Sequence, residues 1–195
     1  MSEEIAVIDY GPLAGLIGTW QGGKGMDVAP EPDAIERNPY YETLTFEAIG
    51  DVTNAEQQIL TALHYRQRVS RKSNDKVFHD ETGYWMWDAA SGVVMHSLTI
   101  PRGVAVLAGG RYDGPNSNGD VVLAVAAKLG DPDWQIIQSP FMRDNASTIE
   151  FAHQITLSGD SLTYSETTIL DIYGNKRFEH TDANRLERVS ADRSL

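Results

Sequence analysis

The chain has 195 residues, a net charge of −12 and no cysteine. This length suits one domain with a substantial core, and the acidic balance disfavours nucleic acid, because phosphate contacts need clustered lysine and arginine. The absence of cysteine excludes disulfides, thiolate metal sites and a cysteine nucleophile. The first residues are acidic and no apolar run reaches about 18 residues, so we expect a cytoplasmic protein with no signal peptide and no membrane span.

Most of the chain alternates between apolar and polar residues as β-strands do, with turn-forming residues between the segments. Helical signals are short: residues 13–17 near the start, and a second candidate over 55–60 after Thr53 and Asn54, which can cap a helix. The second stretch would alternatively form a turn into the next strand. The expected strands are 41–48, 58–70, 83–87, 93–100, 103–108, 121–128, 147–158, 161–172 and 177–189.

This pattern predicts an all-β fold, an up-and-down antiparallel β-barrel of about eight to ten strands with a short N-terminal helical turn. We expect a single barrel domain over residues 1–195, with flexible ends over 1–12 and 190–195. A barrel of this size can hold one small ligand inside. An immunoglobulin-like sandwich is disfavoured, because the Cys…Trp…Cys spacing of that fold is missing.

A Gly-x-Trp motif follows the expected helical turn in LIGTWQG, residues 16–22. The motif resembles that of the calycin superfamily, which includes the lipocalins and the fatty-acid-binding proteins. In those barrels the tryptophan closes one end, and a basic residue of the last strand lies on its ring. The resemblance therefore implies that Trp20 is buried at one end of the barrel, in a cation–π contact with Arg185 or Arg188.

Two further stretches, VFHDETGYWMW (77–87) and SGVVMHSLTIPRGVAVLAGG (91–110), resemble the central hairpin of the nitrobindin family. The last expected strand, FEHTDANRLERV (178–189), falls where that family carries its haem-ligating histidine. This resemblance covers nearly the whole chain and implies a barrel that binds ferric haem b, with His180 as the axial ligand of the iron. It also implies chemistry on nitric oxide, isomerisation of peroxynitrite to nitrate, and pairing of two barrels into a homodimer.

The chain departs from the nitrobindin pattern in three places. GTWQGGKG has Lys24 where the third glycine of the family motif belongs, and MDVAPEPDAIERNPYYE replaces a Tyr-Pro-Thr segment of the family. The last strand also carries polar Asp182 and Asn184 where a haem pocket favours apolar residues. These differences indicate a distinct subfamily of the same barrel.

The last expected strand has no purely apolar face. His180, Asp182 and Asn184 share one face, and the opposite face is more charged, so we expect these three residues to point inward. An imidazole in the interior can bind haem iron or contact another ligand, and its second nitrogen then needs an orienting partner. A buried Asp182 also needs a partner, either an arginine such as Arg66 or Arg68 or an imidazole.

Two other histidines lie on strands that border the expected pocket. His79 shares a face with Trp85 and with Gly83, which would leave room for a flat ligand. His96 alternates with apolar residues, so we expect at least one of the two histidines to reach the interior. SPFMRDNAS, residues 139–147, is expected to form a mobile rim over the barrel mouth. The expected ligand-contacting residues are His180, His79, His96, Asn184, Asp182 and Trp85.

Two other functions remain open beside haem binding. The barrel would serve as a haem-free carrier of a small apolar or amphipathic ligand, as fatty-acid-binding proteins do. Alternatively, it would be a calycin-type enzyme with His180, Asp182 and Asn184 in acid–base roles. Asp182 and Asn184 favour these two functions, because burying either residue beside a porphyrin without partners costs about 1–3 kcal/mol. The sequence shows no zinc or phosphate-binding motif.

Overall fold

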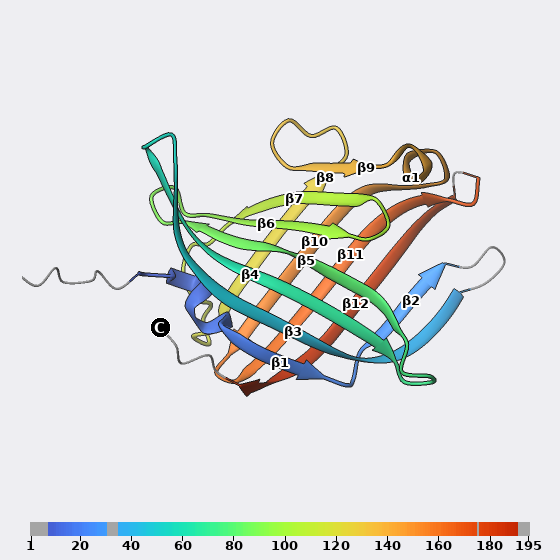
Figure 1. Ribbon diagram of the computed structural model, residues 1–195, viewed down its shortest axis with the longest axis horizontal. Coiled ribbons are helices and arrows are strands. Elements are labelled where there is room, and N and C mark those ends of the chain that lie inside the picture. The colour runs from blue at the N-terminus through green and yellow to red at the C-terminus, as the bar shows by residue number, and fades with distance from the viewer. Residues whose placement is uncertain (1–7, 31–34, 175, 191–195) are drawn as a thin grey trace, which may run out of the picture.

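The computed structural model describes residues 8–30, 35–174 and 176–190 (Figure 1). Most of these residues belong to β-strands, with one 3-10 helix before them and one short α-helix among them. The elements are η1 (Gly11–Leu16), β1 (Gly18–Gly22), β2 (Met26–Pro30), β3 (Ile35–Asn54), β4 (Gln58–Arg71), β5 (Val77–Asp88), β6 (Val93–Ile100), β7 (Val104–Arg111), β8 (Val121–Lys128), β9 (Gln135–Gln138), α1 (Pro140–Asn145), β10 (Ala146–Ser158), β11 (Ser161–Ile172) and β12 (Lys176–Ser190).

Ten of the strands form a closed antiparallel barrel in the order β1-β12-β11-β10-β8-β7-β6-β5-β4-β3. β1 closes the ring because it pairs with β3 on one side and with β12 on the other. β2 lies beside β3 and meets β12 at one residue pair, while β9 pairs with β7. The predicted all-β barrel of eight to ten strands is therefore confirmed.

The turn between β3 and β4 settles the second helical candidate. The helix considered over 55–60 is wrong, because Ala55 and Glu56 adopt left-handed φ angles of 49° and 56° in a tight turn. Two successive residues with positive φ match the right-handed twist of a hairpin and cannot continue a helix. The alternative interpretation, a turn into the next strand, is confirmed.

The N-terminal helical turn is confirmed as η1, which covers one end of the barrel. Of the two ends expected to be flexible, residues 1–7 and 191–195 lie outside the described residues. Tyr10 is buried and η1 begins at Gly11, so the last part of the expected flexible segment packs on the barrel.

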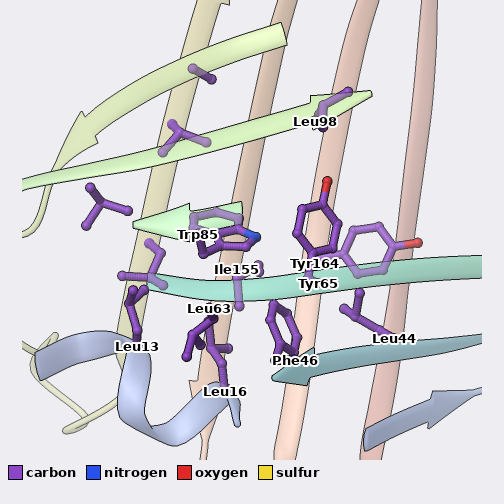
Figure 2. Close-up of a cluster of buried hydrophobic side chains, with 14 of the residues drawn as sticks. Leu13, Leu16, Leu44, Phe46, Leu63, Tyr65, Trp85, Leu98, Ile155 and Tyr164 are labelled. Carbon is purple, nitrogen blue, oxygen red and sulfur yellow. The ribbon is translucent and has the colours of Figure 1, made fainter. Parts of the chain in front are cut away.

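Apolar side chains fill the barrel at the η1 end (Figure 2). Leu13 and Leu16 of η1 pack with Phe46, Leu63 and Trp85 of three strands, and all five side chains are almost completely buried. Burying one such side chain stabilises the fold by about 1.5–3 kcal/mol. This half of the barrel interior is therefore filled by side chains.

Trp20 lies at the closed end beneath an arginine of the last strand. Its ring is fully buried, and its indole N–H donates a hydrogen bond to the carbonyl of Leu16 at 2.7 Å. The guanidinium carbon of Arg188 lies 4.0 Å from the ring centroid. Arg188 also donates hydrogen bonds to the carbonyls of Gly15, at 2.6 Å, and Ile17, at 2.5 Å. The implied cation–π contact is confirmed, with Arg188 as its cation.

Arg188→Ala is expected to lower the free energy of unfolding by about 2–4 kcal/mol, because it removes the cation–π contact and leaves two carbonyls without donors. The matched control is Arg185→Ala, on the same strand, whose guanidinium bonds Glu187 on the outer surface. The control is expected to change the free energy of unfolding by less than about 1 kcal/mol. Urea unfolding followed by tryptophan fluorescence measures both, and equal losses would contradict the prediction.

Candidate ligand-binding cavity

A cavity of about 440 Å³ opens at the end of the barrel opposite η1. Its lining residues come from the ends of β4, β6 and β11 and the starts of β5, β7, β10 and β12, which meet at the end farthest from η1 (Figure 1). The volume lies in the range of small-molecule sites, about 300–1,000 Å³. The apolar lining includes Leu98, Ile100, Val104, Val106, Phe151 and Leu170.

His180 of β12 lines this cavity, and a carboxylate holds one of its ring nitrogens. The Nε2 atom lies 2.8 Å from Oδ1 of Asp27, a buried residue of β2 whose other oxygen accepts a hydrogen bond from Asn38. Nδ1 of His180 has no hydrogen-bond partner among the described residues. Burial acts to lower the pKa of His180, but the hydrogen bond to Asp27 and the charges of Asp27, Glu166 and Asp182 together hold that pKa above its usual value.

His79 lines the same cavity from β5 and forms a second pair with a carboxylate. Its Nε2 atom lies 3.3 Å from Oε2 of Glu81, whose other oxygen accepts a hydrogen bond of 2.5 Å from the hydroxyl of Tyr65. Burial acts to lower the pKa of His79, but the hydrogen bond to Glu81 and the charges of Glu81, Glu166 and Asp182 together raise that pKa above its usual value. The prediction that His79 or His96 reaches the interior is confirmed.

Asp182 ends a chain of hydrogen bonds that runs from the cavity into the protein. The Tyr40 hydroxyl donates to Asp182 and lies 2.8 Å from the Tyr164 hydroxyl, which lies 3.0 Å from Oε2 of Glu42. Three contacts need three hydrogens and the two hydroxyls supply two, so one of the two carboxyl groups carries a proton. Burial, the main cause, raises the pKa of Glu42 to about 7 and that of Asp182 to about 6.

The two arginines expected to partner Asp182 pair with another carboxylate. Arg66 and Arg68 both lie within ion-pair distance of Asp80 on the outer surface, at 2.7 Å and 3.8 Å. Gln67 between them points inward, as strand alternation requires. The predicted arginine and imidazole partners of Asp182 are therefore wrong, and a tyrosine hydroxyl takes their place.

Asn184 is buried below the cavity and does not line it. Its amide nitrogen donates a hydrogen bond of 2.9 Å to Oε1 of Glu42. The predicted inward orientation of His180, Asp182 and Asn184 is confirmed, but only the first two reach the cavity.

His96 and Trp85 also lie below the cavity, with their rings stacked at a centroid distance of 4.3 Å. Both ring nitrogens of His96 are buried without a hydrogen-bond partner, and burial holds its pKa well below the usual value. Neither residue lines the cavity, and both belong to the buried layer beneath it. Figure 2 shows the hydroxyls of Tyr65 and Tyr164 pointing away from Leu16.

The expectation that Gly83 leaves room for a flat ligand is wrong. A Cβ atom at this position would lie 1.9 Å from the carbonyl oxygen of Ser97 on β6. The missing side chain lets two neighbouring strands approach each other. The glycine therefore belongs to the packing of the barrel wall.

The segment SPFMRDNAS forms part of the cavity rim, since α1 lies there and Met142 lines the cavity. Phe141 of the same helix is 70% exposed and points outward.

Sequence reasoning did not identify Asp27, Glu81 or Glu42. The sequence did hold a signal for Glu42. In YYETLTF this residue shares a strand face with Tyr40, Leu44 and Phe46, and a face with three apolar residues is expected to point inward.

The sequence model of the family described as "THAP4-like, heme-binding beta-barrel domain" matches residues 9–188. The chain is also similar to a solved structure, the crystal structure of Rv2717c from M. tuberculosis, with a TM-score of 0.70 and 22% sequence identity. That similarity covers 93% of this chain and 100% of the other, and at this identity it concerns the fold alone. No curated protein sequence matches the chain.

Within the described ranges, no helix is long and apolar enough to cross a bilayer. The same residues contain no cluster of three or more histidines and carboxylates arranged to hold a metal ion directly.

Proposed function

Because the chain belongs to the THAP4-like, heme-binding β-barrel family, we propose that its cavity binds ferric haem b with His180 as the axial ligand. One observation carries the proposal: His180 lines the cavity with one ring nitrogen held by Asp27 and the other without a partner among the described residues. Metal-ligating histidines commonly have a carboxylate on the second nitrogen.

The other walls of the cavity suit a porphyrin. Apolar side chains of β6, β7 and β11 can cover the ring, and Arg71 and Arg102 at the same cavity can meet acidic substituents. Haem bound there would supply the iron centre for nitric oxide binding and for isomerisation of peroxynitrite to nitrate, the chemistry of nitrobindins. Asp27 would orient His180 by accepting a hydrogen bond from its Nε2–H. The proton on Nδ1 would pass to solvent, since only an unprotonated ring nitrogen can bind a metal.

Haem titration of the wild-type protein is expected to give a Soret band that His180→Ala abolishes, while its thermal unfolding transition stays close to that of the wild type. Asp27→Asn should keep the band but weaken haem affinity about 10- to 100-fold, as loss of an outer-shell partner does. His64→Ala, on the outer surface beside Glu47, is the control and should bind as the wild type does. An unchanged Soret band in His180→Ala would exclude this residue as the ligand.

A haem-free carrier of an amphipathic ligand is the second candidate. The observation that favours it is the charged part of the cavity wall, which includes Asp27, Glu81, Glu166 and Asp182. An absent Soret band in the wild-type titration would select this function. The acid–base enzyme with His180, Asp182 and Asn184 is less well supported, because Asn184 does not line the cavity.

A further inference from the structure

The charged side chains that line the cavity divide into those with a partner and those without. Every carboxylate has a close hydrogen-bonding partner. Asp27 bonds His180, Glu81 bonds Tyr65 and His79, Glu166 bonds His153, and Asp182 bonds Tyr40. The remaining charged groups are Arg71 and Arg102. Among the described residues, neither has a carboxylate within ion-pair distance.

Both arginines contact the same residue, Phe78, at the start of β5. The guanidinium of Arg71 lies over the Phe78 ring, 4.8 Å from its centroid. Arg102, in the turn between β6 and β7, donates a hydrogen bond of 3.2 Å to the Phe78 carbonyl. Two cations from different hairpins therefore lie together at one side of the cavity.

Arg71 has unused hydrogen-bonding capacity. Its Nε atom is buried and has no hydrogen-bond partner. The charge of Arg71 helps to lower the pKa of Asp27. Both oxygens of Asp27 are nevertheless already bonded, one to His180 and one to Asn38. A buried guanidinium nitrogen without a partner is costly, and an acidic group of a ligand would remove that cost.

We infer that the cavity takes its ligand as an anion, with an apolar body against the barrel wall and a carboxylate held by Arg71 and Arg102 beside Phe78. The inference rests on the proposed ligand-binding role of the cavity but not on haem. The carboxylate can come from the propionates of haem or from the head group of a fatty acid. Planar guanidinium groups suit carboxylates because they can donate two parallel hydrogen bonds.

The experiment compares acids with their neutral esters on the full chain. The probes are haem and haem dimethyl ester, followed by absorption, and dodecanoate and methyl dodecanoate, followed by isothermal titration calorimetry. In the wild-type protein, esterification is expected to weaken binding of at least one acid about tenfold or more. The double variant R71Q/R102Q should bind the acids as weakly as the wild type binds the esters, with ester affinity unchanged.

Arg68→Gln is the matched control, because Arg68 lies on the same strand as Arg71 but pairs with Asp80 outside the barrel. It should retain wild-type affinity for every probe. Equal affinity for acid and ester in the wild-type protein, or no binding of either acid, would overturn the inference. If the affinity for dodecanoate depends on the two arginines and haem does not bind, the inference stands and the proposal of haem binding fails. If haem and its ester bind equally well and dodecanoate shows no dependence on the arginines, haem binding stands and the inference fails.

Discussion

Glu42→Leu is expected to lower the free energy of unfolding by about 3–5 kcal/mol, since it leaves buried donors without an acceptor. The Glu42 side chain is 1% exposed and is bonded by Gln67 at 2.8 Å, Asn184 at 2.9 Å and Tyr164 at 3.0 Å. The matched control is Glu47→Leu, on the outward face of the same strand, with an expected change below about 1 kcal/mol. Chemical denaturation near neutral pH measures both variants.

The pH dependence tests the protonation of Glu42 separately. Its pKa is raised from 4.5 to about 7, so the folded state holds a proton that the unfolded state has lost. The wild type should therefore lose stability as pH rises through this interval, because the folded state binds more protons. Glu42→Gln should lose this part of the slope. A slope identical to that of the wild type would show that Glu42 is ionised in the folded protein across the interval.

His96→Phe is expected to make the free energy of unfolding fall less steeply as the pH decreases below 6.5. Burial, helped by the nearby charge of His153, holds the His96 pKa well below 6.5, and the charge of Glu166 opposes this only in part. As pH falls below 6.5, the unfolded chain takes up a proton at this residue that the folded protein does not. The wild type should therefore lose about 1.4 kcal/mol per pH unit through His96 alone.

The slope, rather than the absolute stability, is the measurement for His96→Phe. A change in packing against Trp85 shifts the free energy of unfolding by the same amount at every pH. Only the loss of a titrating group changes the slope between about pH 4 and pH 6. Parallel curves for the variant and the wild type would contradict a neutral His96 in the folded protein.

The barrel could be predicted because its determinants are local. Alternation along each strand and glycine-rich turns specify a meander of antiparallel strands, and a meander of this length closes on itself. The inward row of His180, Asp182 and Asn184 followed from the same two-residue period. The pairing of Arg188 with Trp20 came from the family resemblance, which left Arg185 as an equal candidate.

The partners of the inward polar residues could not be predicted, because they come from distant strands. Asp27 meets His180 because β2 lies beside the mouth of the barrel, and β2 belongs to the segment that replaces the Tyr-Pro-Thr segment of the nitrobindin pattern. Tyr40 meets Asp182 across the interior, and alternation gives the face of each residue but not its height in the barrel. Depth also separates Asn184 from the cavity, although it shares a face with His180.

Closure of the barrel by its first and last strands has a consequence for how the protein is made. Arg188 bonds the carbonyl of Ile17 across 171 residues of sequence. Contacts of such separation form late, after the entropy cost of a long loop has been overcome. A chain growing from its N-terminus cannot complete the ring until β12 has left the ribosome, and β12 carries His180. A nascent chain that lacks β12 therefore has neither a closed ring of strands nor the strand that places His180 in the cavity wall.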